Sequence, residues 1–186
     1  MFPACCRLAS SLTLALALPA YAQAPAAETL DGVIVTGTRA GGRTVLNTPV
    51  LVDVYTEDDL RRAGAVGQEL GQALAMLLPS FNFPRQSNSG GSDHVRAAQL
   101  RGLSPDQVLV LINGKRRHTS AIVNVGTKIG KGTAPVDFNS IPVSAIERIE
   151  VLRDGAGAQY GSDAIAGVIN IILKSGAEGG SASISY

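Results

Sequence analysis

Residues 146–174 read IERIEVLRDGAGAQYGSDAIAGVINIILK, and this stretch decides the fold. Polar and apolar residues alternate from Glu147 to Leu152, which predicts a strand with Ile149 and Val151 on one face. The glycine-rich segment that follows interrupts the alternation, because glycine adopts backbone angles that other residues resist. Residues 168–173 then form a continuous, mostly β-branched run, typical of a strand covered on both faces. The stretch therefore predicts a strand, a turn, a short helix and a second strand.

Shorter elements are predicted ahead of this stretch. Asn113-Gly114 after an apolar run is a strong hairpin signal, and Thr56 with Asp59 three residues later matches a capping box. Ser144 with Glu147 repeats the capping-box pattern and predicts a further helix start. The predicted strands cover residues 50–55, 95–103, 107–113 and a return from Lys115, and the predicted helices cover 56–63 and 67–78. The pattern predicts an α+β fold, with a small mixed four-stranded sheet, short helices, long loops and no transmembrane helix.

Two long irregular segments separate these elements. Residues 80–93 (SFNFPRQSNSGGSD) are polar and glycine-rich, and residues 119–133 contain three glycines. This composition predicts exposed loops. Loops of such length within a compact domain are usually functional.

The first 22 residues have the composition of an export signal. Arg7 supplies positive charge, residues 8–18 form a short apolar run, and Ala20-Tyr21-Ala22 fits the small-residue cleavage rule. The apolar run is too short to span a bilayer. Cleavage removes Cys5 and Cys6 and leaves 15 basic residues (16 minus Arg7) against 15 acidic ones. The mature chain therefore has no thiol chemistry, and no net charge that attracts nucleic acid or anionic membranes.

Residues 23–45 are predicted to be a flexible lead-in. Within them, Val33 to Val35 is a short β-prone run flanked by glycines. Such an isolated extended segment can add to the edge of another protein's sheet, where backbone hydrogen bonds provide affinity. It fits equally well as the first strand of the domain, and the residues alone leave both interpretations open.

Catalytic and cofactor sites have little support in the sequence. His94 and His118 lack a partner at metal-ligand spacing, and no serine lies in a G-x-S-x-G elbow. Residues 155–161 (GAGAQYG) follow a strand but lack the G-x-G-x-x-G spacing of a dinucleotide-binding turn. Lys115 to His118 form a basic cluster that can bind anionic ligands or nucleic acid, although a solvated turn is the simpler interpretation. We therefore expect a protein that is not an enzyme and that has no cofactor and no nucleic-acid partner.

Taken in order, these motifs resemble the plug domain of TonB-dependent outer-membrane receptors. Residues 31–39 (DGVIVTGTR) resemble the TonB-box region, and residues 56–60 (TEDDL) resemble the family's strand-to-helix step. Residues 100–103 (LRGL) with 108–116 (VLVLINGKR) match its central hairpin, and 146–174 match its most diagnostic block. The resemblance implies a domain that lies inside a large outer-membrane barrel and blocks the pore. It also implies that substrate binds above the plug, while the inner-membrane protein TonB pairs with the box and pulls.

The resemblance further implies roles for individual residues. Arg101 and Arg153 resemble plug arginines that this family pairs with glutamates of the barrel wall. Glu147 and Glu150 are grouped with them as anchoring candidates, although their pattern alone indicates a solvated or ion-paired strand face. The implied TonB box comprises Val33, Ile34, Val35, Thr36 and Gly37. The loop candidates for substrate contact are Arg85, Gln86, Asn88, Ser104 and Asn124.

After the plug, only residues 177–186 remain, and they resemble the opening of a first barrel strand. We divide the chain into a signal peptide (1–22), a lead-in with the TonB box (23–45), a plug (46–176) and a barrel start (177–186). This division describes an exported receptor truncated before its barrel. The expected function is to gate the energised uptake of an iron chelate, cobalamin or oligosaccharide across the outer membrane. The alternative is a free periplasmic module that binds a ligand or TonB.

Overall fold

The computed structural model describes residues 51–64, 69–85, 90–126, 129–154 and 156–176. The predicted signal peptide, TonB box and barrel start lie outside these residues. Within the described ranges, no helix has the length and apolar character needed to cross a membrane.

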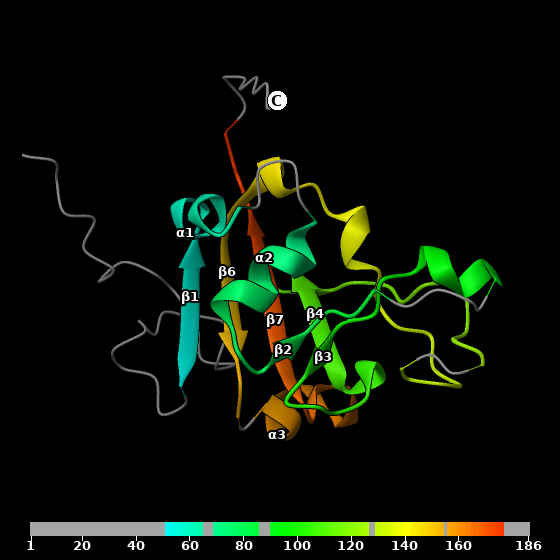
Figure 1. The fold of residues 1–186 in the computed structure, drawn as a ribbon. Helices are drawn as coiled ribbons and strands as arrows, with labels where there is room; N and C mark the ends of the chain where they lie inside the picture. Colours follow the sequence, from blue (N-terminus) through cyan, green and yellow to red (C-terminus); the bar gives the residue numbers. More distant parts are fainter. Residues whose placement is uncertain (1–50, 65–68, 86–89, 127–128, 155, 177–186) are drawn as a thin grey trace, which may run out of the picture.

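One five-stranded sheet organises the fold (Figure 1). β4 and β7 are parallel, and the other neighbouring strands are antiparallel. The α+β class is confirmed, and the main sheet has five strands, one more than predicted. The predicted return strand from Lys115 is present as β5 and pairs with β4. In spatial order, the strands are β1 (Val52–Thr56), β6 (Ile146–Leu152), β7 (Gly167–Leu173), β4 (Val108–Ile112) and β5 (Lys115–Arg116).

Short helices and turns surround the sheet. The α-helices are α1 (Glu57–Arg62), α2 (Leu70–Leu77) and α3 (Ala156–Tyr160). The 3₁₀ turns are η3 (Gly90–His94), η4 (Pro105–Gln107), η5 (Phe138–Ser140), η6 (Val143–Ala145) and η7 (Ser162–Ala164). In Figure 1, α1 follows directly from the end of β1, and α3 lies at the opposite end of the sheet.

A second, two-stranded sheet pairs β2 (Phe81–Asn82) with β3 (Gln99–Leu100). Phe81 and Phe83 are buried, and their rings lie 5.8 and 6.2 Å from the ring of Phe138. The prediction of an exposed loop over residues 80–93 is therefore wrong at its start. The predicted strand over 95–103 is likewise reduced to the two residues of β3.

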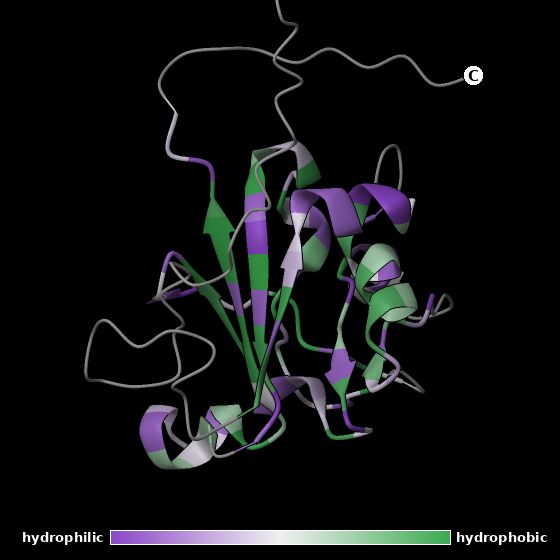
Figure 2. Cartoon of the chain, turned by 90° about the vertical axis from the view of Figure 1, so that its left-hand side faces the viewer, coloured by the Kyte–Doolittle hydropathy of each residue, from purple (hydrophilic) through white to green (hydrophobic). Residues whose placement is uncertain are grey.

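The two faces of the main sheet bury different apolar clusters. On one face, Ile149 and Ile171 pack in a large cluster with Leu74 of α2 and Phe138 of η5. On the other face, a smaller cluster joins β4, β6 and β7 to α3 and η7 through Leu111, Leu152, Val168, Ala156 and Ala164. Figure 2 shows that the apolar residues concentrate in the sheet, whereas α1 is mainly hydrophilic.

β6 contains a bulge between Ile146 and Arg148. Side chains alternate faces along a regular strand, so Ile146 and Ile149, three residues apart, would point to opposite faces. The bulge inserts one residue, and both isoleucines are fully buried in the same cluster. The predicted capping box of Ser144 and Glu147 is therefore wrong, because Glu147 lies in the strand and the preceding turn η6 has no side-chain cap.

The two other local signals are confirmed. The backbone N–H of Thr56 donates to Asp59 Oδ2 at 3.0 Å, and the backbone N–H of Asp59 donates to Thr56 Oγ1 at 3.4 Å, which completes a capping box at α1. Asn113 and Gly114 have φ angles of 49° and 77° and connect β4 to β5. Positive φ at both positions is the geometry of the two-residue hairpin turn that these residue types favour.

We predict that Thr56→Ala lowers the free energy of unfolding by about 1 kcal/mol at neutral pH, because α1 loses its N-cap. Hydrogen bonds from Thr56 hold the pKa of Asp59 below its ordinary value. A carboxyl whose pKa is lower in the folded state contributes stability that is present at neutral pH and is lost as the pH falls below about 4. Urea unfolding at pH 7 and pH 3 should therefore show a smaller acid-induced loss in Thr56→Ala than in the parent. An equal loss in both proteins contradicts the prediction, and Asp58→Asn, which removes a neighbouring carboxylate outside the box, is the control.

We predict a larger effect at the start of β7. Gly167 has a φ of 142°, and a Cβ atom there would lie 2.6 Å from both Leu100 Cδ2 and the carbonyl oxygen of Leu152. Gly167→Ala should therefore lower the free energy of unfolding by more than about 2 kcal/mol. Gly157→Ala is the matched control, since its nearest neighbour would be Ile165 Cγ1 at 4.0 Å. Equal urea midpoints for the two variants would show that the close approach at Gly167 is unimportant.

Candidate functional site

Arg153, a predicted anchor, immediately follows β6 and is paired within the chain. Its Nε lies 2.6 Å from Asp53 Oδ2, and its Nη2 donates to Asp53 Oδ1 at 2.7 Å. Asp53 belongs to the neighbouring strand β1, so the two-pronged ion pair ties the edge strand to β6. A planar guanidinium that meets both oxygens of one carboxylate forms a geometrically specific contact. Sequence reasoning missed Asp53, although its position in the apolar run VLVDVY is a usable signal.

Arg101, the second predicted anchor, lies beside Arg153. Its Nη1 donates to the carbonyl oxygen of Arg153 at 2.9 Å and to Asp154 Oδ1 at 2.7 Å. The structure thus brings together two arginines that are 52 residues apart. The side chains of Arg101 and Asp154 are 44% and 65% exposed, and exposed pairs of this kind contribute between zero and about 1 kcal/mol.

The two glutamates grouped with these arginines lie in different environments. Glu147 is exposed in the bulge and pairs with Arg148 Nη1 at 2.6 Å. Glu150 is 1% exposed in the middle of β6, where Arg148 Nε lies 3.1 Å from its Oε1. Glu147 therefore lies at the opposite end of the strand from Arg153, and Glu150 lies between them. The structure does not bring either glutamate to the arginine pair.

Glu150 belongs to a buried polar network that sequence reasoning missed. Asn170 Nδ2 donates to Glu150 Oε2 at 3.3 Å, and Asn170 Oδ1 accepts from the backbone N–H of Gly114 at 3.0 Å. Burial, and after it the negative charge of Glu150, raise the pKa of Tyr160. The network connects β6 and β7 with the β4–β5 turn. A single asparagine inside the apolar run VINIIL is the signal that could have revealed it.

Asn124, a predicted substrate contact, is 1% exposed and holds its own loop together. Its backbone N–H donates to the carbonyl oxygen of Thr133 at 2.8 Å, and its carbonyl accepts from Gly132 at the same distance. Its side-chain Nδ2 donates to the carbonyl oxygen of Ile129 at 3.0 Å. The buried Asn124 thus joins the two sides of the loop through hydrogen bonds. The neighbouring Ile122, Val123 and Val125 are exposed.

The other loop candidates lie apart from Asn124. Arg85 is exposed and pairs with Glu69 at 3.2 Å. Ser104 is half-buried before η4, and its carbonyl oxygen accepts from Gln107 at 3.0 Å. Among the described residues, no hydrogen bond or ion pair joins Arg85, Ser104 and Asn124. Gln86 and Asn88, and the box residues Val33 to Gly37, lie outside the described residues.

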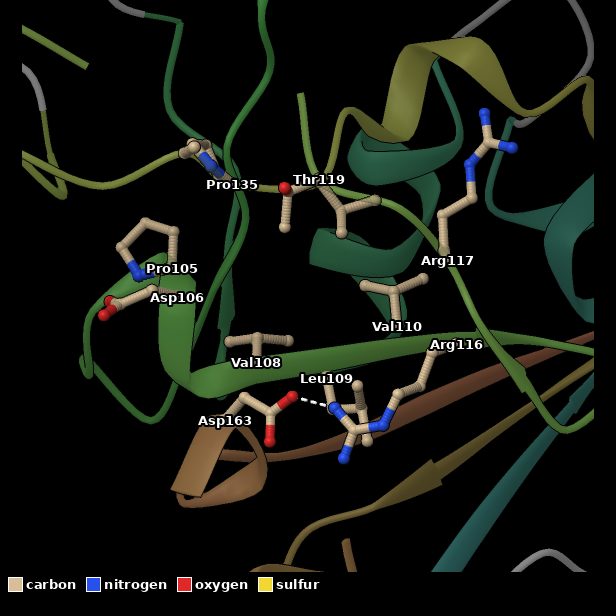
Figure 3. Close-up of a pocket in the computed structure, with 12 residues that line it drawn as sticks. Pro105, Asp106, Val108, Leu109, Val110, Arg116, Arg117, Thr119, Pro135 and Asp163 are labelled. Atoms are coloured by element: carbon tan, nitrogen blue, oxygen red, sulfur yellow. Dashed lines mark hydrogen bonds and ion pairs between the residues drawn. The ribbon is translucent and has the colours of Figure 1, made fainter. Parts of the chain in front are cut away.

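A cavity of about 240 Å³ lies beside β4, between the sheet and the ends of the loop over residues 119–133, where Thr119 and Pro135 line it (Figure 3). Val108 and Val110 line its floor, and Pro105 and Pro135 face it from the side. Arg116 closes one side through an ion pair with Asp163, and it also donates to the carbonyl oxygen of Tyr160. These two contacts of Arg116 connect the β4–β5 hairpin to the α3–η7 segment.

We predict that Asn124→Ala loosens the loop. The substitution removes the hydrogen bond to Ile129, so we expect trypsin to cleave after Lys131 at least several-fold faster than in the parent chain. Asn139→Ala, at an exposed asparagine of η5, is the control and should leave the rate unchanged. Limited proteolysis followed by mass spectrometry measures both rates. Equal cleavage of the Asn124→Ala variant and the parent would contradict the structural role of Asn124.

Comparison with known proteins identifies the family to which the fold belongs. The family model described as TonB-dependent Receptor Plug Domain matches residues 44–168. The vitamin B12 transporter BtuB of Vibrio vulnificus is 33% identical over 168 residues, which are 90% of this chain and 25% of the relative. The ferric enterobactin receptor PirA of Pseudomonas aeruginosa is 36% identical over 123 residues, which are 66% of this chain and 16% of the relative. The chain thus spans a quarter or less of the length of these curated relatives.

Solved structures agree with this comparison. A mutant of the ferric enterobactin receptor PfeA from Pseudomonas aeruginosa is 32% identical, with a TM-score of 0.52 over 70% of this chain and 18% of that chain. The unliganded ferric citrate transporter FecA has a TM-score of 0.54 at 20% identity and covers 70% of this chain and 18% of its own, a likeness of fold alone. These relatives are receptors and transporters, not enzymes. Because the family model matches more than half of its residues, the chain belongs to the TonB-dependent receptor plug domain family.

Proposed function

We propose that this chain is the plug of a TonB-dependent outer-membrane transporter that takes up a small-molecule nutrient. The match of residues 44–168 to the plug family, in a chain whose fold is similar to that of these receptors, is the observation that carries the proposal. The named relatives are a vitamin B12 transporter, receptors for ferric enterobactin and a ferric citrate transporter. The proposed location is the outer membrane after export, and the proposed energy-supplying partner is TonB.

In this proposal, Val33 to Gly37 form the box that pairs with a strand of TonB. Backbone hydrogen bonds along an added strand supply affinity without needing a deep pocket. The box lies ahead of β1, which is an edge strand of the main sheet. Among the described elements, a pull on the box therefore reaches β1 first, where the antiparallel pairing with β6 and the Arg153–Asp53 ion pair resist it.

Arg101 and Arg153 remain our proposed contacts with a barrel wall. Their present partners, Asp154 and Asp53, keep the charges satisfied without one. The exposed Arg101–Asp154 pair is weak enough to be exchanged for a barrel carboxylate at little cost in free energy. Arg153 has the more buried, two-pronged pair, so it is better suited to bridge Asp53 and the wall. Glu147 and Glu150 contact Arg148 instead and have less support as anchors.

The same intramolecular pairs also favour the alternative, a periplasmic plug-like module that binds ligand or TonB by itself. Asp53 and Asp154 pair with the two arginines within the chain, so such a module would not depend on carboxylates of a barrel. The transporter plug and a module that binds TonB both use the TonB box, so one binding experiment addresses these two functions together.

We predict that the chain without residues 1–22 binds the C-terminal domain of TonB and that Val35→Pro weakens this binding at least about tenfold. Proline lacks the backbone N–H that strand pairing uses, and tenfold corresponds to about 1.4 kcal/mol, the order of one or two lost hydrogen bonds. Ala27→Pro, in the lead-in but outside the box, is the matched control and should bind as the parent does. Titration by biolayer interferometry gives the three dissociation constants. Binding that is absent, or unaffected by Val35→Pro, removes the box assignment.

A further inference from the structure

The β4–β5 turn contains a chemically reactive pair, Asn113 and Gly114. The chain has seven asparagines, and Asn113 is the only one that a glycine follows. The side-chain amide of an asparagine is open to attack by the backbone nitrogen of the next residue, and glycine hinders this attack least because it has no Cβ atom. Asparagine is for this reason a thermolabile residue. The turn is therefore a candidate site of spontaneous chemical modification.

The pair lies at the surface, where water reaches it. Asn113, Gly114 and the following Lys115 are all exposed. Within the described ranges, Asn113 is one of only two residues other than glycine that have a positive φ. Solvent exposure gives the pair no protection, so any protection has to come from its contacts with the rest of the fold.

Three hydrogen bonds attach the turn to β7. The backbone N–H of Asn113 donates to the carbonyl oxygen of Ile171 at 2.9 Å. Asn113 Oδ1 accepts from the backbone N–H of Leu173 at 2.9 Å. The backbone N–H of Gly114 donates to Asn170 Oδ1 at 3.0 Å. The last two bonds engage the two groups that would react with each other, the side-chain amide of Asn113 and the backbone nitrogen of Gly114.

Asn170 is itself held in place as the acceptor for Gly114. It is fully buried, and its Nδ2 donates to Glu150 Oε2 at 3.3 Å. It lies opposite Leu111 of β4 on one side and opposite Glu150 of β6 on the other. A buried side chain that is hydrogen-bonded through both its oxygen and its nitrogen loses much if it moves away from these partners. Gly114 therefore keeps its partner as long as β4, β6 and β7 stay paired.

We propose that Asn113 is a deamidation site that β7, through Asn170 and the backbone of Leu173, keeps unreactive in the folded chain. In the reaction, the Gly114 nitrogen forms a bond to Asn113 Cγ, the Cγ–Nδ2 bond breaks, and ammonia leaves with the proton of the Gly114 N–H. Water then opens the cyclic imide at one of its two C–N bonds and yields aspartate or isoaspartate. Water is the only other reactant. The turn has to leave β7 before the reaction begins, because both reacting groups must first give up their partners there.

Modification would alter the β4–β5 hairpin. Isoaspartate adds one carbon to the backbone of the turn, and a two-residue turn fixes the register of the strands that it joins. Lys115 and Arg116 would lose their alignment with β4, and with it the position from which Arg116 pairs with Asp163. The amount of modified chain would therefore report how often the turn has left β7. This inference does not depend on the proposed function.

The test follows the deamidation of the chain without residues 1–22 at mildly alkaline pH by peptide mass spectrometry. Asn113 should deamidate about tenfold or more slowly in the folded parent than in the parent unfolded by urea, because the reaction in the folded chain requires two hydrogen bonds to open. Asn170→Ala removes the acceptor of Gly114 and should raise the rate in the folded chain at least several-fold. Asn113→Gln should remove the signal, because attack on the longer side chain needs a larger and less favourable ring.

Ile169→Val is the matched control for the loss of stability that Asn170→Ala brings. Ile169 and Asn170 are neighbours in β7 and are both 0% exposed, and the smaller side chain weakens the core without removing a partner of the turn. The Ile169→Val rate should stay close to that of the folded parent.

Equal rates in the folded and the unfolded parent would overturn the proposal. So would a rate in Asn170→Ala no higher than that in Ile169→Val, with both chains shown to be folded by circular dichroism. If Asn170→Ala does not fold, hydrogen exchange of the Gly114 amide in the parent decides the question. An amide that exchanges as fast as in the unfolded chain contradicts protection by β7, and slow exchange that matches slow deamidation supports it.

Discussion

The antiparallel pairing of β6 with β7 is the interaction on which the other elements depend. These are the two longest strands, and their register runs from Ile146 opposite Leu173 to Leu152 opposite Val168. Both strands contribute to both apolar clusters, because their side chains alternate between the two faces of the sheet. α2 and the β2–β3 pair pack on one face, and α3 with η7 packs on the other. Loss of the β6–β7 register would remove the support of both layers at once.

The buried polar network explains why this register is unique. Two mostly apolar strands can slip against each other at modest cost, whereas a buried carboxylate must keep its partners. Glu150 lies directly opposite Asn170, and Asn170 reaches the turn at Gly114. A slip by even one residue would separate these two buried groups and break the hydrogen bond between them. The network thus adds specificity to a pairing whose strength comes from apolar burial.

Local signals predicted the elements whose cause is local. The α1 cap depends on two residues three apart, the β4–β5 turn on two adjacent residues, and β6 and β7 on periodicity within each strand. The errors arose where distant residues decide. Phe81 and Phe83 lie in a polar stretch whose composition predicts a loop. They are nevertheless buried in the core, because they pack against Phe138, more than fifty positions away. Likewise, β6 has a bulge at Glu147 because Ile146 and Ile149 both pack in the same apolar cluster. The resemblance assigned Arg101 and Arg153 the same role, but their adjacency and their partners Asp154 and Asp53 required the fold.

The position of β1 has a mechanical consequence under the proposed function, in which force enters through the N-terminal side of the domain. An edge strand is held by one neighbour only, so side-chain contacts carry more of its attachment than they do for a central strand. Two ion-pair contacts flank β1: Asp53 with Arg153 near its start, and Glu57 just beyond its end, 2.8 Å from Lys174. The hydrogen bond from Lys174, followed by the charge of Arg61, holds the pKa of Glu57 below its ordinary value, so this contact stays ionised at neutral pH. Because both contacts reach the segments that follow β6 and β7, they connect β1 to the central pair of strands, and force on β1 would be passed to that pair.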